Sequence, residues 1–402
     1  MPDSSPPLAG IRVLDIATFI AAPYCATVLG EFGAEVIKIE QPGAGDPFRK
    51  FGTPSDRPDS SLAWLSEARS KKSITLDLRQ PDGVDLFKRL VAVSDVVCEN
   101  FRPGTLEKWG IGWDDLKVIN PDLIMLRVTG YGQTGPYKDR PGFARIAHAV
   151  GGLSNLAGMP GETPVTPGST SLGDYLAGLY GTVGVLIALL HRRDGGSGQY
   201  IDLGLYEAVF RVLDEVAPAY DRQGIIRESE GAGTRNACPH GHFPTQDGKW
   251  VAIACTTDKM FARLAAVMEQ PDLALPERYG RQESRLAAQQ EIIGLVSAWT
   301  GARTRDQVMA LCLGGDVPAG PLNTIEDIFA DPHFEAREDL TTIDDPVVGP
   351  TVVPGVLPKL SGTPGRITNL GPSLGNANAE VYGDLLDLTD TDLERLRRTG
   401  II

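Results

Sequence analysis

Short apolar runs alternate with helix-length segments through the first 130 residues, and few folds accommodate such an alternation. The apolar runs are rich in Val and Ile and bounded by turn residues: IRVLDIA, AEVIKIE, SITLDL, SDVVCEN and DLIMLRVTG. Such runs are typical of strands buried on both faces of a sheet. Helical patterns lie between several of them, at residues 23–32, 81–93 and 105–119. The order predicts an α/β fold with an open, parallel, Rossmann-like sheet.

The pattern changes after about Tyr220. A polar, glycine-rich stretch, RQGIIRESEGAGTRNACPHGHFPTQDG, leads to a strand signal, KWVAIAC, and a helix signal at residues 258–268. The C-terminal part is rich in Pro, Gly and Val, which indicates extended chain. We therefore expect a large α/β domain with residues 1–220 as its N-terminal part. A smaller α+β domain of residues 221–330 is inserted, and residues 331–402 return to the large domain.

Composition excludes several classes of protein. A formal net charge of −14 argues against a nucleic-acid partner, because phosphates require a basic face. The longest apolar window, residues 176–190, is interrupted by Gly and Thr and is shorter than the roughly 20 residues of a membrane span. It therefore predicts a buried core helix and no membrane partner. The start, MPDSSPPLAG, is not a secretory signal, and five scattered cysteines suit reduced thiols. Both features predict a cytoplasmic protein.

The usual cofactor motifs do not follow the first strand. A dinucleotide fold would place G-x-G-x-x-G there, but the segment DIATFIAAPYCATVLG has its first glycine at Gly30. Rossmann-type NAD binding is therefore disfavoured, and we expect no tightly bound cofactor. The PGAGD stretch, residues 42–46, follows the second strand signal and is more typical of an ordinary turn than of a ligand loop.

One carboxylate, Asp174, interrupts the apolar segment TSLGDYLAGLYG. Apolar residues recur from Leu172 with helical spacing, and Thr170 or Ser171 can cap the helix, so Asp174 belongs to its first turn. An acid there complements the helix dipole, which is one explanation. The other is chemical, because a helix N-terminus that lowers the carboxyl pKa would keep a nucleophile ionised. Spacing alone leaves both explanations open.

The chain resembles the class III coenzyme A transferases over nearly its whole length. That family includes formyl-CoA:oxalate CoA-transferase, carnitine CoA-transferase and the α-methylacyl-CoA racemases. The resemblance is carried by blocks in the same order: PLAGIRVLDIATFIAAPYCATVLGEFGAEVIKIEQPGAGDPFR, KKSITLDLR, SDVVCENFRPGTLEKWGIG, GYGQTGPYKDRPGF, STSLGDYLAGLYGTVGVLIAL and VPAGPLNTIEDIFADPHF.

The resemblance implies a role for particular residues. The family's nucleophilic aspartate falls on Asp174, and its CoA-contacting Asn-Phe pair falls on Asn100 and Phe101. That pair ends a predicted strand, where open α/β sheets bind ligands. The resemblance also places Ile20 at the CoA site, at a position where relatives often carry Gln. The nearby cations either meet CoA phosphates or are simply solvated: Lys72, Arg102 and Lys108.

The family covers its site with a glycine-rich loop, whose counterpart here contains Gly231 and Gly233. His240 and His242 follow it and are either contacts for a substrate carboxylate or polar residues at the domain boundary. Together with Cys238 they provide three possible metal ligands at alternate positions. A zinc site usually needs a fourth ligand, and none is nearby in the sequence, so we expect no metal site. His148 stands near a position where relatives often have Gln, and it either lines the pocket or is structural.

The resemblance implies a transferase that moves CoA from an acyl-CoA donor to a carboxylic acid, with CoA as co-substrate. Asp174 would form an aspartyl anhydride and then an aspartyl-CoA thioester. We expect succinyl-CoA as donor and a small dicarboxylic or aryl-substituted acid as acceptor. The family also implies an interlocked homodimer, with a related subunit as a further partner.

Two alternatives remain. A racemase would need its His-Asp pair where this chain has Phe143 and Ala144. A non-catalytic acyl-CoA-binding subunit would not use Asp174.

Overall fold

The computed structural model describes residues 5–168 and 170–402, which form two compact units. The first comprises Met1–Leu153, Gly168–Asp214 and Glu335–Ile402, and the second comprises Ser154–Pro167 and Glu215–Phe334. Residues 154–167, which the sequence analysis placed in the N-terminal part of the large domain, group with the second unit. The Gly231 N–H donates to the Gly158 carbonyl at 3.0 Å, and the Ser229 hydroxyl donates to the Met159 carbonyl at 3.3 Å.

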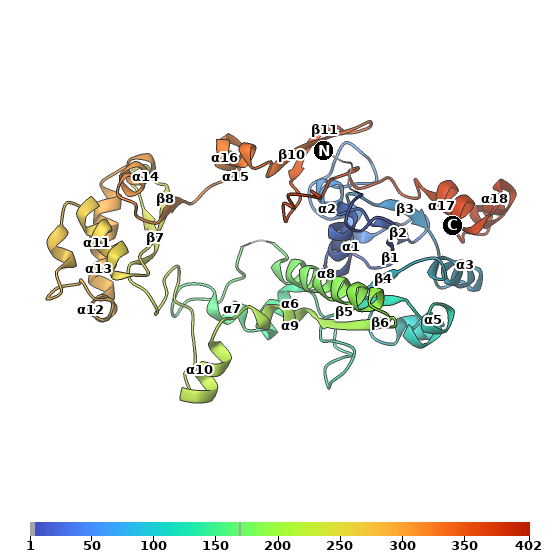
Figure 1. Ribbon diagram of the computed structural model, residues 1–402, viewed down its shortest axis with the longest axis horizontal. Helices are drawn as coiled ribbons and strands as arrows, with labels where there is room; N and C mark the ends of the chain where they lie inside the picture. Colours follow the sequence, from blue (N-terminus) through green and yellow to red (C-terminus); the bar gives the residue numbers. More distant parts are fainter. Residues whose placement is uncertain (1–4, 169) are drawn as a thin grey trace. The chain divides into compact units, whose positions relative to one another are not determined.

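A six-stranded sheet forms the centre of the first unit, with strand order β3-β2-β1-β4-β5-β6 (Figure 1). The strands are β1 (Arg12–Asp15), β2 (Glu35–Glu40), β3 (Lys72–Thr75), β4 (Val96–Glu99), β5 (Ile124–Thr129) and β6 (Gln199–Gly204). Every neighbouring pair is parallel; Val13, for example, lies opposite Val36 on one side and Val96 on the other. The predicted parallel α/β sheet is confirmed. Its order is that of dinucleotide-binding folds, in which ligands bind beyond the carboxyl ends of the strands where the order reverses.

Helices cover both faces of the sheet, because successive strand residues point to opposite sides. Leu14 and Ile37 belong to the core on one face, with α3 (Pro81–Val91), α5 (Trp113–Ile119), α17 (Asn378–Leu386) and α18 (Asp390–Arg398). Val13 and Val36 belong to the core on the other, with α1 (Ala21–Glu31), α6 (Ala144–Val150), α8 (Leu172–Arg193) and α9 (Leu205–Arg211) (Figure 1). The remaining elements of this unit are η1 (Pro47–Lys50), α2 (Leu62–Glu67), α4 (Thr105–Lys108), β10 (Leu340–Asp345) and β11 (Gly349–Pro354).

The C-terminal segment is bonded to the edge strand β3. The buried Tyr382 hydroxyl donates to the Thr75 carbonyl at 2.8 Å, and the Asp77 N–H donates to the Ile401 carbonyl at 2.9 Å. A strand edge with free N–H and C=O groups is a liability unless it is covered. The C-terminal helices therefore complete the core on that side of the sheet.

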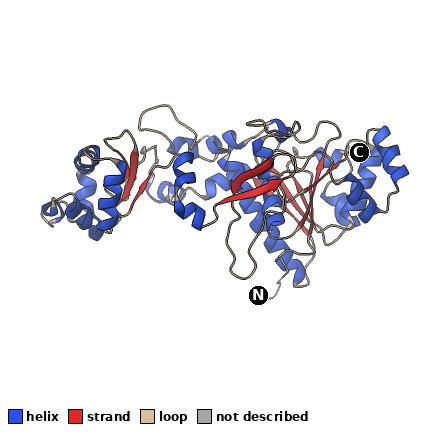
Figure 2. Cartoon of the chain, turned by 90° about the horizontal axis from the view of Figure 1, so that it is seen from above, coloured by secondary structure: helices blue, strands red, loops and turns tan. Residues whose placement is uncertain are grey.

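The second unit is a small α+β assembly (Figure 2). Its antiparallel sheet has the order β7-β8-β9, with β7 (His240–Pro244), β8 (Trp250–Ala254) and β9 (Ala319–Pro321). Its core contains Phe243, Phe261, Val296 and Val308. The helices are α10 (Val216–Gln223), α11 (Asp258–Val267), η2 (Pro271–Ala274), α12 (Gln282–Ala287), α13 (Gln289–Gly301), α14 (Arg305–Gly314) and α15 (Ile325–Ala330). Two of the four boundaries between the units fall within short helices, α7 (Leu153–Leu156) and α16 (Pro332–Ala336), and the other two fall after residues 167 and 214.

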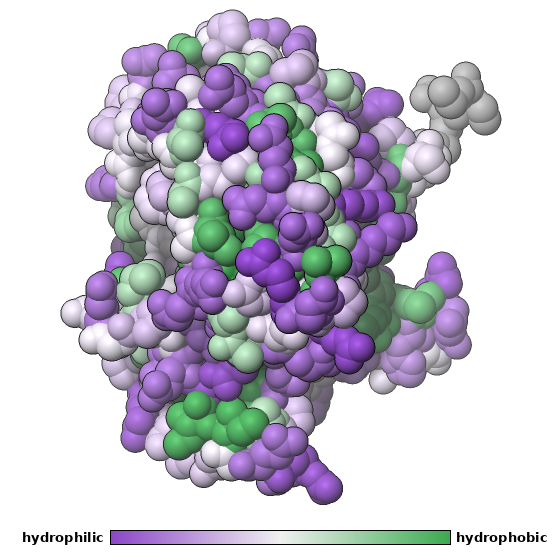
Figure 3. All heavy atoms as spheres, turned by 90° about the vertical axis from the view of Figure 1, so that its left-hand side faces the viewer, coloured by the Kyte–Doolittle hydropathy of each residue, from purple (hydrophilic) through white to green (hydrophobic). Residues whose placement is uncertain are grey.

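Among the described residues one helix, α8, is long and apolar enough by composition to cross a membrane. One of its faces is packed against protein: an added Cβ at Gly178 would lie 2.7 Å from the Ala21 carbonyl, and one at Gly181 would lie 2.7 Å from Leu126. The glycines thus allow α1 and β5 to approach closely. The opposite face is exposed and apolar. Elsewhere, the face drawn in Figure 3 is mainly hydrophilic, with hydrophobic residues in small separate groups.

Candidate active site

Asp174 lies in the first turn of α8, as the sequence predicted. Its N–H donates to the Ser171 carbonyl at 2.9 Å. Ser171 is the N-cap residue, but its side chain makes no capping hydrogen bond. The expectation that the helix end lowers the pKa of this carboxyl is wrong: burial, which disfavours the charged form, raises the pKa of Asp174 to about 7. Desolvation outweighs the dipole, whose effect at a helix end is only about 0.3–1 kcal/mol.

His148 takes over the capping of α8. Its Nε2 atom accepts a hydrogen bond of 2.8 Å from the Gly173 N–H, one residue before Asp174. The ring is 1% exposed, and burial, followed by the charge of Arg145, lowers the pKa of His148. An accepting Nε2 carries no proton, so the imidazole is neutral with its proton on Nδ1. Two roles were predicted for His148, in the pocket lining or in the structure. Its hydrogen bond to the Gly173 N–H gives it a structural role next to Asp174.

The N-terminus of α8 adjoins the loop that follows β1. Tyr175 packs against Tyr24, with ring centroids 4.9 Å apart, and both contact the apolar cluster of Ile20, Phe48, Trp64 and Ala68. Phe48 belongs to η1, directly after the loop at the end of β2. Tyr175, the residue after Asp174, therefore contacts residues that follow the carboxyl ends of the first two strands.

A cavity of about 540 Å³ opens at these carboxyl ends. Its walls contain Phe101 and Trp109, whose ring centroids lie 5.2 Å apart, and the exposed cations Lys50 and Arg79. Ala44 and Gly45 also line it, so the PGAGD stretch is part of the cavity wall rather than an ordinary turn only. Aromatic faces and cations together suit a ligand with a base and phosphates.

The predicted CoA residues after β4 lie at or near this cavity. Phe101 lines it. Asn100 clamps the end of β1: its Oδ1 accepts from the Thr18 N–H at 2.9 Å and its Nδ2 donates to the Thr18 carbonyl at 2.7 Å. Arg102 is exposed and donates to the Asp139 carbonyl at 2.6 Å. Lys108 is exposed in α4, one residue before Trp109.

Two predicted contacts do not fit the cavity. Lys72 begins β3, at the amino edge of the sheet, and its ammonium is paired with Glu35 at 2.7 Å and with Glu380 at 2.6 Å. Ile20 is 7% exposed and packs in the apolar cluster with Phe48, so it offers no group to a ligand. The two corrections have different causes: Lys72 lies at the wrong end of its strand, and the side chain of Ile20 is buried in the core.

Several residues that line the cavity were not predicted from the sequence, among them Lys50, Arg79 and Trp109. Arg79 follows β3 within SITLDLR, where a cation after a strand could have been singled out by the rule that ligands meet carboxyl ends. Its guanidinium is 55% exposed and binds Asp77 through Nε at 2.8 Å and an Nη at 2.9 Å. Trp109 gave no comparable signal, because a lone aromatic residue in a helical pattern is usually part of a core.

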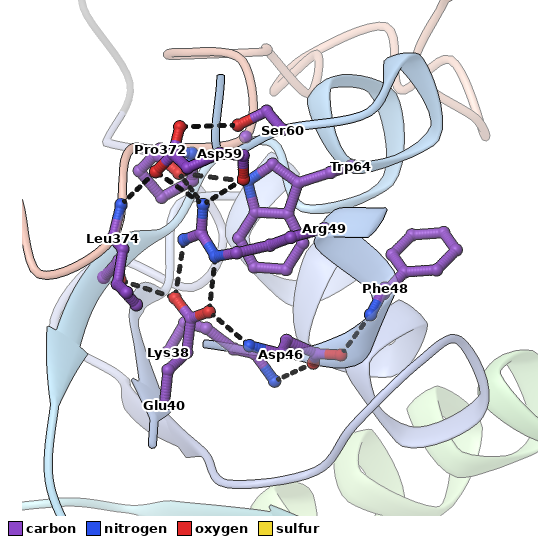
Figure 4. A network of polar contacts seen from close by, with 12 residues as sticks. Lys38, Glu40, Asp46, Phe48, Arg49, Asp59, Ser60, Trp64, Pro372 and Leu374 are labelled. Carbon is purple, nitrogen blue, oxygen red and sulfur yellow. Dashed lines mark hydrogen bonds and ion pairs between the residues drawn. The ribbon is translucent and has the colours of Figure 1, made fainter. Parts of the chain in front are cut away.

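A buried polar network supports the loop that forms the cavity wall (Figure 4). Glu40 receives two hydrogen bonds from Arg49, at 2.6 and 2.7 Å, and accepts the Asp46 N–H at 2.8 Å. Arg49 lies over the Trp64 ring at 3.9 Å and donates to the Pro372 carbonyl at 3.0 Å. Lys38 is paired with Asp46 at 3.0 Å. Together these hydrogen bonds and ion pairs hold the loop in place.

The other predicted residues meet in a separate cavity of about 780 Å³ in the second unit. Gly231, Gly233, His240 and His242 all line it. Among the described residues no group of three or more His, Cys, Asp or Glu side chains could hold a metal ion.

The fold agrees with what the chain is similar to. The sequence pattern described as CoA-transferase family III matches residues 8–378. This chain belongs to CoA-transferase family III. It is a CoA-transferase, and CoA is its co-substrate.

Two relatives of this CoA-transferase come from Chloroflexus aurantiacus. The alpha subunit of succinyl-CoA–L-malate CoA-transferase is 61% identical over 396 residues, which cover 98% of this chain and 92% of the relative. The beta subunit is 58% identical over 398 residues, 98% of each chain. Among solved structures, a CAIB/BAIF family protein from Brucella suis matches with a TM-score of 0.85 and 34% identity, over 95% of this chain and 100% of that one.

The racemase alternative lacks its acid–base pair in this CoA-transferase. Phe143 is the N-cap residue of α6 and is 67% exposed, and Ala144 is the first residue of that helix. Neither side chain can hold or transfer a proton.

Proposed function

We propose that this chain transfers CoA from succinyl-CoA to a small dicarboxylic acid of the L-malate type, with Asp174 as nucleophile. The names of the relatives supply the donor and acceptor. The observation that carries the role of Asp174 is its setting: a half-buried carboxyl at the start of α8, whose pKa burial raises to about 7. Such a group is ionised in part at neutral pH and is a stronger nucleophile than a solvated carboxylate.

The proposed reaction has two symmetrical halves. An oxygen of Asp174 attacks the thioester carbonyl carbon of succinyl-CoA, the C–S bond breaks, and CoA thiolate leaves a mixed anhydride. The thiolate attacks the Asp174 carbonyl, which releases succinate and leaves an aspartyl-CoA thioester. The acceptor carboxylate then attacks this thioester and expels CoA thiolate. The thiolate attacks the acceptor carbonyl of the second anhydride, which gives the new acyl-CoA and free Asp174. Dividing the exchange in this way gives each step a good leaving group.

The cavity at the carboxyl ends of β1–β4 is proposed as the CoA site. Phe101 and Trp109 offer faces for the adenine, and Lys50 and Arg79 offer charge for phosphates. Asn100 then acts as a structural clamp for this site. The second unit is proposed to be an insertion between the two parts of the large domain, and the reduced thiols suit a cytoplasmic location.

The exposed face of α8 supports a dimer. Five apolar side chains on it are each more than 40% exposed: Leu179, Val183, Leu186, Ile187 and Leu190. A contiguous apolar face of this kind marks a protein contact. We propose that it is covered in an interlocked homodimer, or by a related subunit of the kind that the relatives' names describe. Ile187→Glu should give monomers in light scattering, whereas Val118→Glu, at a 78% exposed position of α5, should leave the dimer intact. A dimer that persists in the Ile187→Glu variant would contradict the proposal that this face of α8 is the dimer interface.

The nucleophile is tested with Asp174→Ala. Turnover with succinyl-CoA and L-malate should fall by at least about 10³-fold, in line with the loss of a covalent catalyst. CoA should still stabilise the variant against thermal unfolding. Retained turnover would reject Asp174, and a wild-type chain that binds CoA without any turnover would identify a binding subunit instead.

A further inference from the structure

His240 and His242 present their imidazoles on one face of the small sheet. Successive strand residues alternate between faces, so His240, His242 and Pro244 share one side of β7. Phe243, between His242 and Pro244, points to the other side, is 1% exposed and belongs to the core. Pro244 lies opposite Trp250 of β8, so the indole is on the same side as the two histidines. Both histidines and Trp250 line the cavity of about 780 Å³.

The loop that closes this cavity is held at both ends. Arg235 binds Glu230 through its backbone N–H at 2.7 Å and through Nε at 2.5 Å. Gln282 donates to the Asn236 carbonyl at 2.6 Å, and Gln289 donates to the Thr234 carbonyl at 3.4 Å. Glu230 is the one acid among the described lining residues, and its charge is compensated by Arg235. Among the described lining residues no uncompensated carboxylate therefore opposes a bound anion.

The polar groups of the cavity are not all satisfied. The Nδ1 atom of His240 is shielded from solvent and has no hydrogen-bond partner among the described residues. The 13-residue helix α13 begins at the wall with Gln289 and Gln290, and its N-cap residue, Ala288, cannot cap it. Helix N-termini favour anions. The rest of the wall contains Met159, Ile293 and Leu322, which suit a short carbon chain.

We infer that this cavity binds a short-chain dicarboxylic acid, with His240 and His242 as the groups that recognise a carboxylate. The inference deepens the proposed function and rests on it, because such an acid is the proposed acceptor. On this inference the two histidines also select a diacid over a monoacid of equal length. When the second carboxylate is missing, the polar groups that would bind it remain unpaired, which weakens binding of the monoacid.

The test is direct binding followed by nitrogen NMR of the histidine side chains in the full-length chain. There are five histidines, and His240→Gln and His242→Gln assign the relevant signals. Succinate should move both signals in a saturable way, and butyrate should need at least tenfold higher concentration. The exposed His333 of α16 serves as a control and should not move. Succinate that moves neither signal, or butyrate that acts equally well, would overturn the inference.

A kinetic experiment separates the subsite from the chemistry. In the His240→Gln/His242→Gln double variant the ratio of kcat/KM for L-malate to kcat/KM for butyrate, each as acceptor of CoA from succinyl-CoA, should fall at least tenfold. An unchanged preference would overturn the role in selection. If Asp174 is never acylated but succinate still moves the histidine signals, the subsite stands and the proposed chemistry fails.

Discussion

The Nε2 atom of His148 accepts a hydrogen bond of 2.8 Å from the Gly173 N–H. Gly173 precedes Asp174 in the first turn of α8, and no side chain caps that turn by the usual N-cap contact. A Cβ atom added at Gly173 would lie 3.2 Å from the His148 ring, so the imidazole and the backbone are in close contact. His148 therefore fixes the direction in which the first turn presents its carboxyl group.

Replacement of His148 should act through Asp174. His148→Ala removes the acceptor and leaves a void, and we expect kcat to fall roughly ten- to hundredfold, the range in which small misplacements of reacting groups act. The KM for acyl-CoA should change little. His148→Gln can still accept the N–H through its amide oxygen and should recover most of the rate. Steady-state kinetics of both variants check this; equal losses would show that the ring is needed for another reason.

Asp174→Asn should stabilise the protein at alkaline pH. The pKa of Asp174 is raised from its ordinary value to about 7, so the folded chain binds a proton more tightly than the unfolded chain. The free energy of unfolding of the wild type therefore falls as pH rises from about 4 to about 7, by on the order of 4 kcal/mol. The unfolding midpoint of the variant should exceed that of wild type above pH 7 and approach it near pH 4. A difference that does not change with pH would contradict the raised pKa.

Arg79 and Lys72 provide a test of the proposed CoA site and its control, because Arg79 follows the carboxyl end of β3 and Lys72 begins the strand. Arg79 lines the cavity, whereas Lys72 is paired with Glu35 and Glu380 at the other end of the strand. Arg79→Ala should raise the Kd for CoA roughly tenfold, since a charge-assisted hydrogen bond contributes about 1.5–3 kcal/mol. Lys72→Ala should leave it within about twofold. Calorimetric titration with CoA measures both, and the reverse ranking would place CoA elsewhere.

The two glycines of the loop in the second unit should not respond alike to alanine. Gly231 has φ +64°, and its added Cβ would lie 2.9 Å from the Met159 sulfur. Left-handed backbone costs other residues about 1–2 kcal/mol. Gly233 has ordinary φ, and its nearest contact would be 3.4 Å. Gly231→Ala should lower kcat/KM for the acid roughly tenfold, and Gly233→Ala should have little effect. Equal effects would mean that loop geometry is not what these residues provide.

The sequence predicted the elements that bury apolar runs. The first five strand signals correspond to β1–β5, because strands covered on both faces are continuous runs of Val and Ile. β6 was missed because it is an edge strand, and most of its residues are exposed or half-buried. The expected helix at residues 105–119 is divided into α4 and α5, between which Gly110 has φ +69°. The apolar periodicity of the sequence continues across this turn, so the sequence pattern does not show that the helix is interrupted there.

Sequence patterns predicted some properties of the site but not others, for a physical reason. A motif can place Asp174 in a first turn, but its pKa depends on how much of the chain covers it, which is a tertiary property. The same holds for His148, whose acceptor role requires α6 to pack against the start of α8. Local patterns predict which residues are near one another in a turn or strand, and packing decides what each of them does.

Acylation of Asp174 is the most direct test of the account. The chain is incubated with succinyl-CoA, quenched with hydroxylamine and digested, and the peptide that contains Asp174 is examined by mass spectrometry. We predict a hydroxamate on Asp174, formed with succinyl-CoA and absent with CoA alone, because hydroxylamine traps both the anhydride and the thioester. An unmodified Asp174 in a preparation that turns over succinyl-CoA would contradict the covalent mechanism.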